Sequence, residues 1–279
     1  MLKNILLWLL AFIITAGTAI YQRSTGPTYP VKGETKFNNT PVLYKFDRSH
    51  GGETNHEVAV ITDSAGISAF LYYKRFKTND AFTQLPMKYR EGSFKAELPH
   101  QPPAGKLEYF VIIKSDSHEL QIPNEHIVIR FKGDVPMWIL IPHVIFMFLA
   151  MMLAARTGLQ YFTKDQKVIS FTKWTMAILA IGGFILGPLM QEYAFGELWT
   201  GVPFGYDLTD NKTLIAMIVW LIAFFRMRKS GEGKTAAKWA LAAFIIMFFV
   251  YLIPHSVLGS ELDYNKLDNN INTEITTQQ

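Results

Sequence analysis

Five long apolar runs without Asp, Glu, Lys or Arg dominate the hydrophobic pattern of the chain. The first extends from Ile5 to Ile20 near the amino terminus, and the others follow a long polar region. These four runs are Val135 to Ala155, Trp174 to Met190, Leu214 to Phe225 and Trp239 to Ile253. Uncharged runs of this kind are typical of membrane-spanning helices. The pattern therefore predicts an integral membrane protein, with an amino-terminal segment at residues 1–20 and an α-helical bundle of four transmembrane helices at residues 135–257.

The amino-terminal run admits two interpretations. It follows Lys3 and ends in small residues from Thr15 to Ala19, which is typical of a signal peptide that is cleaved. It can also remain as a short transmembrane anchor. We expect a retained anchor, with the cleaved signal peptide as the alternative.

Lysine and arginine cluster in two of the connections between apolar runs. One connection carries Arg156, Lys164, Lys167 and Lys173, and the other carries Arg226, Arg228, Lys229, Lys234 and Lys238. Loops rich in these residues stay on the cytoplasmic side of a membrane. We therefore expect a protein of the bacterial cytoplasmic (inner) membrane, with the amino terminus inside and both residues 21–134 and the carboxyl terminus outside.

Residues 21–134 contain short runs that are alternating or β-branched, as β-strands are. Turn-forming stretches such as His50-Gly51-Gly52 and Thr78-Asn79-Asp80 separate them. The six clearest runs are PVLYKF, HEVAVIT, SAFLYYKRF, SFKAELP, KLEYFVIIKS and HIVIRFK. Strands at this spacing predict an all-β sandwich of two sheets in a periplasmic domain.

The segment from Ala69 to Lys114 also resembles the immunoglobulin-like or fibronectin type III modules of bacterial exported proteins. The likeness rests on LYYKRF, a following LPM strand, EGSFKAELP and PAGKLEYFVI. In that comparison Tyr109 occupies the place of a tyrosine corner. The resemblance implies an immunoglobulin-like fold, and modules of this kind commonly bind a protein partner in the cell envelope.

The residues after Ser260 are polar and lack periodicity. Such a composition does not supply enough apolar surface for a core. We therefore expect residues 258–279 to form a disordered outer tail.

Composition and motifs exclude several kinds of chemistry. Cysteine is absent, which excludes disulfides, cysteine-ligated metals and covalent c-type haem attachment. The histidines of the β domain are scattered, without a nucleophile elbow, an H-E-x-x-H motif or a phosphate loop. We interpret His50-Gly51-Gly52 as a turn first and as a metal site second. We expect no enzymatic activity and no nucleic-acid partner.

Two histidines, His143 and His255, lie in or at the apolar runs. Each ends the same tetrapeptide, Leu-Ile-Pro-His. Proline removes a backbone donor and disrupts the helix one turn back, so it can redirect the next side chain. In the expected orientation, both histidines point toward the outward loop from Phe195 to Lys212. Two imidazoles suit bis-histidine ligation of non-covalent haem, so His143 and His255 are the candidate metal ligands.

The loop from Phe195 to Lys212 supplies the remaining candidates for a haem site. Aromatic side chains can pack on the porphyrin, and these are Phe195, Trp199, Phe204 and Tyr206. Asp207 is a candidate acceptor that orients an imidazole. Lys212 is a candidate partner for a haem propionate.

A purely structural interpretation fits the same loop. Aromatic residues gather at membrane interfaces for energetic reasons alone. Asp207 and Asp210 can cap the following helix, and Lys212 can extend its ammonium group to the interface. Because the run from Leu214 is short, we expect its helix to begin within residues 209–213, with Asp210 or Thr209 as the N-cap.

The run from Gly187 to Tyr264 resembles the closing part of the haem-handling membrane proteins of cytochrome c maturation, which carry a tryptophan-rich outer loop. Their loop opens with an aromatic and a glycine, passes through tryptophan and ends in an aromatic and an aspartate. The matching residues are Phe195 and Gly196, Trp199, and Tyr206 and Asp207. His143 and His255 match the outer histidines that flank the loop in that family.

This resemblance implies a haem-binding or haem-handling site linked to cytochrome biogenesis or to a respiratory complex. The alternative is a membrane-anchored interaction or scaffold subunit without a cofactor. In that case the β domain binds an envelope partner and the helices only hold the chain in the bilayer.

Reporter fusions test the expected orientation. A reporter fused at Lys234 should behave as cytoplasmic, and reporters within residues 28–132 or after Ser260 should behave as external, because basic loops are retained inside. Paired fusions to alkaline phosphatase and to green fluorescent protein measure this. An external Lys234 or an internal carboxyl terminus would contradict the orientation.

Overall fold

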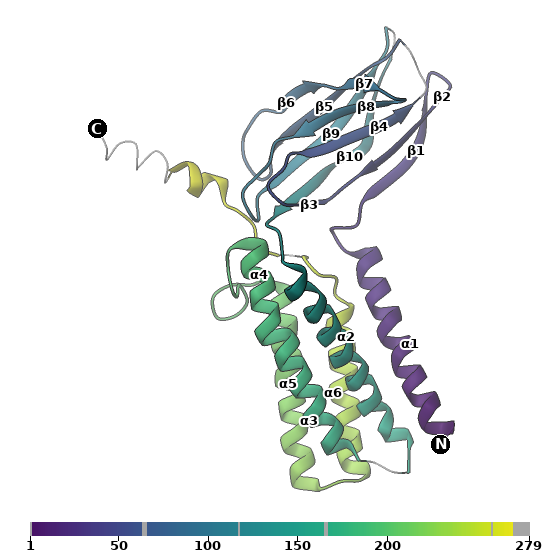
Figure 1. The fold of residues 1–279 in the computed structure, drawn as a ribbon, viewed down its shortest axis with the longest axis vertical. Helices are drawn as coiled ribbons and strands as arrows, with labels where there is room; N and C mark the ends of the chain where they lie inside the picture. The colour runs from purple at the N-terminus through teal and green to yellow at the C-terminus, as the bar shows by residue number, and fades with distance from the viewer. Residues whose placement is uncertain (1, 63–65, 117, 165–166, 258, 270–279) are drawn as a thin grey trace, which may run out of the picture. The chain divides into compact units, whose positions relative to one another are not determined.

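The computed structural model describes residues 2–62, 66–116, 118–164, 167–257 and 259–269. The chain forms two compact units (Figure 1). The helical unit consists of Met1–Pro27 and Val135–Ser260, and the β unit of Thr28–Asp134 and Glu261–Gln279. The chain therefore leaves the helical unit once to form most of the β unit, returns, and ends in the β unit.

Two five-stranded sheets form the β unit. The strands are β1 (Val31–Phe37), β2 (Thr40–Phe46), β3 (Ser49–Gly51), β4 (His56–Thr62), β5 (Ser68–Arg75), β6 (Thr83–Pro86), β7 (Lys88–Arg90), β8 (Ser93–Leu98), β9 (Lys106–Lys114) and β10 (Glu119–Lys132). One sheet has the order β1-β2-β4-β8-β7 and the other β3-β10-β9-β5-β6. Paired strands are antiparallel except β3, which runs parallel to β10. The predicted two-sheet β domain is confirmed at this level.

Alternation of side chains builds the core between the faces of these sheets. In β4, Val58 and Val60 are buried, whereas Glu57 and Ile61 are exposed, because residues two apart point to the same face. The largest fully buried side chains of this unit are Phe46, Leu71, Leu98, Leu107, Tyr109, Ile113, Ile129 and Phe131. The six predicted runs lie in β2, β4, β5, β8, β9 and β10. The unpredicted strands β1, β3 and β7 are sheet edges, where only one side is paired and polar residues are tolerated.

Tyr109 is fully buried, but it does not form the expected tyrosine corner. Its hydroxyl donates to the carbonyl oxygen of Asp47 at 2.7 Å, and the two residues are 62 positions apart. A tyrosine corner bonds the backbone only a few residues upstream. Tyr109 instead ties β9 to the connection between β2 and β3.

The helical unit contains five helical segments that are long and apolar enough to cross a membrane. Its elements are α1 (Leu2–Thr25), α2 (Met137–Leu159) with a 3-10 turn (Gln160–Phe162), α3 (Val168–Ala180), a π-helical stretch (Ile181–Leu186), α4 (Gly187–Phe195), α5 (Leu208–Ser230) and α6 (Lys234–Leu252). The stretch from α3 through α4 is one continuous span. Among the described residues, the prediction of an amino-terminal helix and four further helices, each long and apolar enough to cross a membrane, is confirmed.

Small residues allow these helices to pack closely. Alanines fill the buried faces of α2, α5 and α6: Ala150, Ala154, Ala155, Ala216, Ala223, Ala236, Ala237, Ala240 and Ala243. A Cβ at Gly158 would lie 2.7 Å from the Cβ of Phe244, so the glycine sets the contact between α2 and α6. Trp220 of α5 is fully buried, and its indole nitrogen lies 3.0 Å from the sulfur of Met247 in α6. This small-residue packing is typical of helices in a bilayer, where apolar side chains gain little by leaving lipid.

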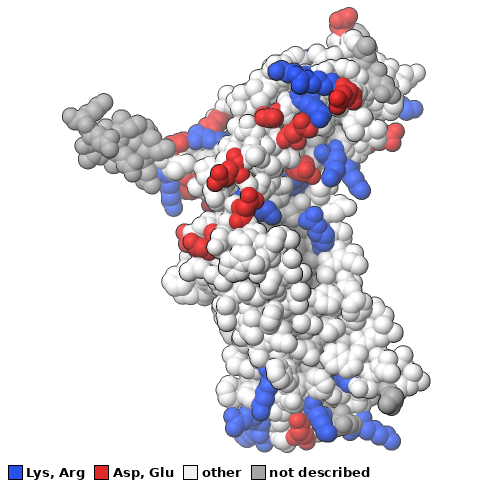
Figure 2. Space-filling model, viewed as in Figure 1, with Lys and Arg blue, Asp and Glu red and all other residues white. Residues whose placement is uncertain are grey.

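Charge separates the two ends of the helical unit. Figure 2 shows a broad band of this unit without charged side chains on the viewed face, and a group of lysines and arginines at one end. We call this end, formed by the connections from α2 to α3 and from α5 to α6, the basic end. The opposite end, where α2 and α5 begin and α4 and α6 stop, is the histidine end, because it carries His143 and His255.

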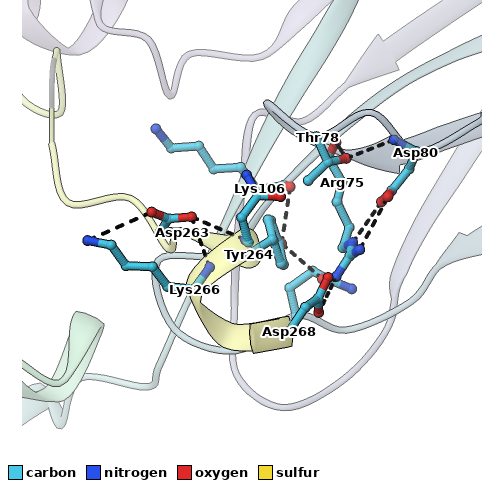
Figure 3. Close-up of polar contacts among 10 residues, drawn as sticks. Arg75, Thr78, Asp80, Lys106, Asp263, Tyr264, Lys266 and Asp268 are labelled. Carbon is cyan, nitrogen blue, oxygen red and sulfur yellow. Dashed lines mark hydrogen bonds and ion pairs between the residues drawn. The ribbon is translucent and has the colours of Figure 1, made fainter. Parts of the chain in front are cut away.

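The prediction of a disordered tail does not hold for residues 261–269, which pack on the β unit (Figure 3). Tyr264 is 4% exposed, and its hydroxyl lies 2.9 Å from Oε1 of Gln101 and 3.1 Å from the carbonyl of Lys106. The amide of Leu262 donates to the carbonyl of Ala104 at 3.1 Å. Residues 258 and 270–279 of the predicted tail lie outside the described residues.

Ion pairs hold the same segment at both of its ends. Glu261 bridges Lys106 at 2.6 Å and Lys77 at 2.8 Å. Asp268 pairs with Arg75 at 2.9 Å, and the guanidinium of Arg75 also lies 5.2 Å from the ring centre of Tyr264. The lysines hold the pKa of the Glu261 carboxyl below its usual range, in spite of partial burial, which acts in the opposite direction. A polar sequence is thus ordered by specific partners instead of by apolar periodicity.

Replacement of Tyr264 tests this docking. Tyr264→Ala should release residues 261–269, because it removes roughly 3 kcal/mol of packing by a buried aromatic ring. Limited proteolysis and hydrogen exchange of this segment measure the release. Lys266→Ala is the matched control, since Lys266 is 82% exposed in its side chain. Equal protection of the segment in both variants would contradict the docking.

Candidate functional site

His143 lies in the first two turns of α2, and its ring contacts the π-helical stretch of the next span. Its Nδ1 lies 3.0 Å from the carbonyl oxygen of Gly182. In the π-helical stretch this carbonyl accepts a hydrogen bond from the amide of Gly187, five residues ahead. The same oxygen accepts a second hydrogen bond from His143. A Cβ at Gly187 would lie 3.8 Å from Cε1 of His143, an ordinary van der Waals distance, so the imidazole lies directly beside this glycine.

This contact assigns the tautomer of His143. A carbonyl oxygen only accepts hydrogen bonds, so Nδ1 must carry the proton and donate it. Nε2 is then the ring nitrogen with a free lone pair, and no hydrogen bond to it is found among the described residues. Metal-binding histidines are commonly oriented in this way by a carbonyl on the other nitrogen.

The two Leu-Ile-Pro-His stretches adopt different backbones. Pro142 lies inside α2, which continues without a break to Leu159. Pro254 follows the end of α6, and Ile253 before it is extended with ψ of 119°. Apolar residues follow His143 and sustain the helix, whereas the polar chain after His255 does not. The expectation that each proline opens its helix is therefore met only at the end of α6.

His255 lies in a turn after α6 and keeps an exposed surface. Desolvation by surrounding atoms, together with positive charge on Lys212 and His143, lowers the pKa of its imidazole, and Asp207 opposes this effect. The imidazole of His255 is therefore neutral at pH 7. The structure thus brings His143, His255, Asp207 and Lys212 close enough to interact electrostatically.

Asp207 is the N-cap of α5, in place of the expected Asp210 or Thr209. Its Oδ1 accepts from the amide of Thr209 at 2.7 Å, and its Oδ2 accepts from the amide of Ser260 at 3.0 Å. The helix begins at Leu208, one residue before the expected range. The carboxylate therefore fixes the start of α5 and the chain segment after α6.

Lys212 is buried and its ammonium donates to the carbonyl of Ile253 at 2.7 Å. Ile253 follows the last residue of α6, where the helix leaves carbonyls without internal partners. Lys212 therefore joins the start of α5 to the end of α6. This bond uses one of the three donors of the ammonium group, and the role as a partner for a propionate stays a prediction.

Asp210 holds the loop that precedes α5. Its Oδ2 accepts from the amides of Thr200 at 2.7 Å and Gly201 at 3.0 Å. Asn211 accepts from the amide of Val202 at 2.8 Å. Sequence reasoning treated Asp210 only as a possible cap and overlooked Asn211. Polar residues at a helix start are a signal for such contacts, but the bonded loop residues cannot be deduced from spacing.

The predicted aromatic residues do not form one platform. The ring of Trp199 stacks on Phe184 of the π-helical stretch, with centres 5.7 Å apart and planes 20° apart. Phe195 is the last residue of α4 and is half-buried. Phe204 and Tyr206 are 82% and 87% exposed, so their rings lie outside the packed cluster. Of the four predicted aromatic residues, Trp199 and Phe195 pack at the histidine end, and the other two do not.

Comparison with known proteins adds no identification. No protein-family model and no curated protein sequence matches the chain.

Among the described residues, no group of three or more His, Cys, Asp or Glu side chains is arranged to hold a metal ion. The arrangement at the histidine end therefore offers two separate imidazoles and not a complete ligand set made of protein side chains.

Two aspartate replacements separate the structural roles at this end. Asp207→Ala should lower the free energy of unfolding by about 0.5–2 kcal/mol, the usual effect of losing an N-cap. Asp210→Ala should instead increase hydrogen exchange of the amides of Thr200 and Gly201 while the start of α5 stays protected. Thermal unfolding and exchange in detergent measure these effects, with the exposed Glu197→Ala as control. Exchange at Thr200 that stays unchanged in Asp210→Ala would contradict the assignment.

Proposed function

We propose that the helical unit binds haem non-covalently at its histidine end, with His143 and His255 as the axial ligands. The protein then handles haem for cytochrome biogenesis or for a respiratory complex, at the outer face of the bacterial cytoplasmic membrane. It performs no catalysis in this proposal. When bound, haem supplies iron and four porphyrin nitrogens, so the protein needs to add only two axial donors.

The orientation of His143 is the observation that carries this proposal. The bond from its Nδ1 to the carbonyl of Gly182 leaves Nε2 as a free lone pair on a fixed ring. The ring is half-buried, so its second nitrogen needs no protein partner and can meet solvent or a ligand. His255, neutral at pH 7, is the neighbouring group best suited to the other axial position.

The remaining predicted residues fit the proposal in altered roles. Asp207 and Lys212 fix the ends of α5 and α6, so they position His255 indirectly. Trp199 packs on Phe184 and supports the loop. Phe204 and Tyr206 are exposed and therefore free to pack on a ligand or on a protein that brings it.

The proposal assigns the β unit an immunoglobulin-like fold and an envelope protein as partner. Its order β2-β4-β8-β7 supports this, because it matches the four-stranded sheet ABED of such a sandwich. The order β10-β9-β5 matches the sheet GFC, with β6 in the place of the added strand C′. β1 and β3 then extend the sheets at their edges. We place this unit and the carboxyl terminus outside, on the basis of the lysines and arginines of the basic end.

A scaffold function without cofactor is the second candidate. The exposed loop residues Leu198, Val202, Phe204 and Tyr206 favour it, because apolar side chains left open next to a bilayer suit a partner or the membrane interface. In that case both histidines are dispensable for assembly of the partner complex.

Haem titration distinguishes the two candidates. Wild-type protein in detergent should develop the Soret band of six-coordinate haem on addition of haemin. His143→Ala and His255→Ala should each give weaker or five-coordinate binding, and the double variant should lose binding. Trp199→Ala should weaken binding by about 1 to 3 kcal/mol, the value of one large apolar side chain.

Controls separate ligation from folding. Added imidazole should restore the six-coordinate spectrum of His143→Ala, because the small ligand can occupy the space of the lost ring. His118→Ala, an exposed histidine in the β unit, should behave like wild type. Absence of a Soret band in folded wild-type protein, or identical spectra in the double variant, would overturn the haem proposal and favour the scaffold.

A further inference from the structure

A second pair of histidines lies in the β unit, far along the sequence from the helical site. His50 belongs to β3 and His56 to β4. Their Nδ1 atoms are 3.3 Å apart, and their ring centres are 5.0 Å apart with planes tilted by 59°. β3 pairs with one sheet through β10, whereas β4 belongs to the other sheet, so the pair spans both sheets of the unit.

Hydrogen bonds determine which nitrogen of His50 is free. Its Nε2 lies 2.9 Å from the carbonyl oxygen of Thr54, which can only accept. Nε2 therefore carries the proton in the neutral ring, and the lone pair of Nδ1 faces His56. The pairing of β3 with β10 and the bond to Thr54 orient this lone pair, as outer partners orient metal-binding imidazoles.

The separation of the two Nδ1 atoms matches a tetrahedral zinc site. Zinc binds imidazole nitrogen at about 2.0–2.1 Å, so two such ligands in a tetrahedron are roughly 3.3–3.4 Å apart. Adjacent ligands of a square-planar Cu²⁺ or Ni²⁺ at the same bond length are only about 2.9 Å apart. The observed 3.3 Å agrees with the tetrahedral value.

We propose that His50 and His56 bind one Zn²⁺ ion through their Nδ1 atoms, with solvent in the remaining positions. The site joins the two sheets of a β unit that has no cysteine for a disulfide. Two protein ligands make it an exchangeable site, since structural zinc sites use four.

The surroundings of His56 suit this role. His56 is 8% exposed, and burial, together with His50, lowers the pKa of its imidazole, whereas Asp47 and Glu57 act in the opposite direction. Of these two carboxylates, Glu57 pairs with Lys95 at 3.1 Å, so Asp47 is the one that favours a cation here. Phe131, fully buried, packs against His50 with ring centres 5.6 Å apart and keeps its imidazole in place.

Zinc competition against a chromophoric chelator tests the site in full-length protein, in detergent and without a histidine tag. Wild type should bind one Zn²⁺ ion saturably in competition with the chelator. His50→Ala and His56→Ala should each weaken this binding by more than about 10-fold, as loss of even an outer-shell partner does. His118→Ala should leave it unchanged. The His143→Ala/His255→Ala double variant should also keep it, so that this test is independent of the haem proposal.

A second measurement does not depend on the buried His56. Zn²⁺ should raise the unfolding temperature of wild-type protein by ligand linkage, and it should not do so for His50→Ala. His50 is half-exposed on a strand of three residues, so this variant is expected to fold. Absence of saturable Zn²⁺ binding by wild type would overturn the proposal. Unchanged binding in both single variants would also overturn it and would assign the 3.3 Å contact to a shared hydrogen bond.

Discussion

Backbone groups at the ends and irregular turns of apolar helices need partners, because hydrocarbon offers none and the helix leaves its terminal amides and carbonyls unpaired. The histidine end of the helical unit is organised around this requirement. His143 donates to Gly182, Lys212 donates to the carbonyl of Ile253, and Asp207 accepts from the amide of Thr209. Lys212 and Asp207 each satisfy a backbone group that the helical pattern leaves over, whereas His143 adds a second donor to a carbonyl that already accepts from Gly187.

This constraint also decides which groups remain available for a ligand. Lys212 and both oxygens of Asp207 are engaged in joining α5 to the end of α6. His143 is different, because one nitrogen satisfies Gly182 and the other keeps its lone pair. The chemistry that the end of the bundle can offer is therefore imidazole chemistry, on which the proposed haem site rests. The π-helical turn presents the carbonyl of Gly182 to His143, and the hydrogen bond between them orients the imidazole ring.

Specific polar contacts play a comparable part in the β unit, where they connect segments that apolar packing alone would leave apart. Tyr264, Glu261 and Asp268 order a polar carboxyl-terminal segment against the sandwich. His50 of β3 and His56 of β4 form a polar contact between the two sheets. Neither place has a local sequence pattern that predicts these contacts: the carboxyl-terminal segment lacks periodicity, and His50 lies in a glycine-rich turn. Residues distant in the sequence therefore determine the structure at both places.

The sequence alone determined the apolar helices and most strands, because both depend on local periodicity that single segments express. It also marked His143, His255 and the loop before α5 as unusual, since polar residues beside membrane spans require a reason. Only the tertiary structure decided what each residue does. Identical Leu-Ile-Pro-His stretches became a helix interior and a helix end, and the N-cap proved to be Asp207. Lys212 meets Ile253 and Tyr264 meets Lys106 across 41 and 158 positions. Such pairs depend on how whole elements pack, and no local spacing encodes that packing.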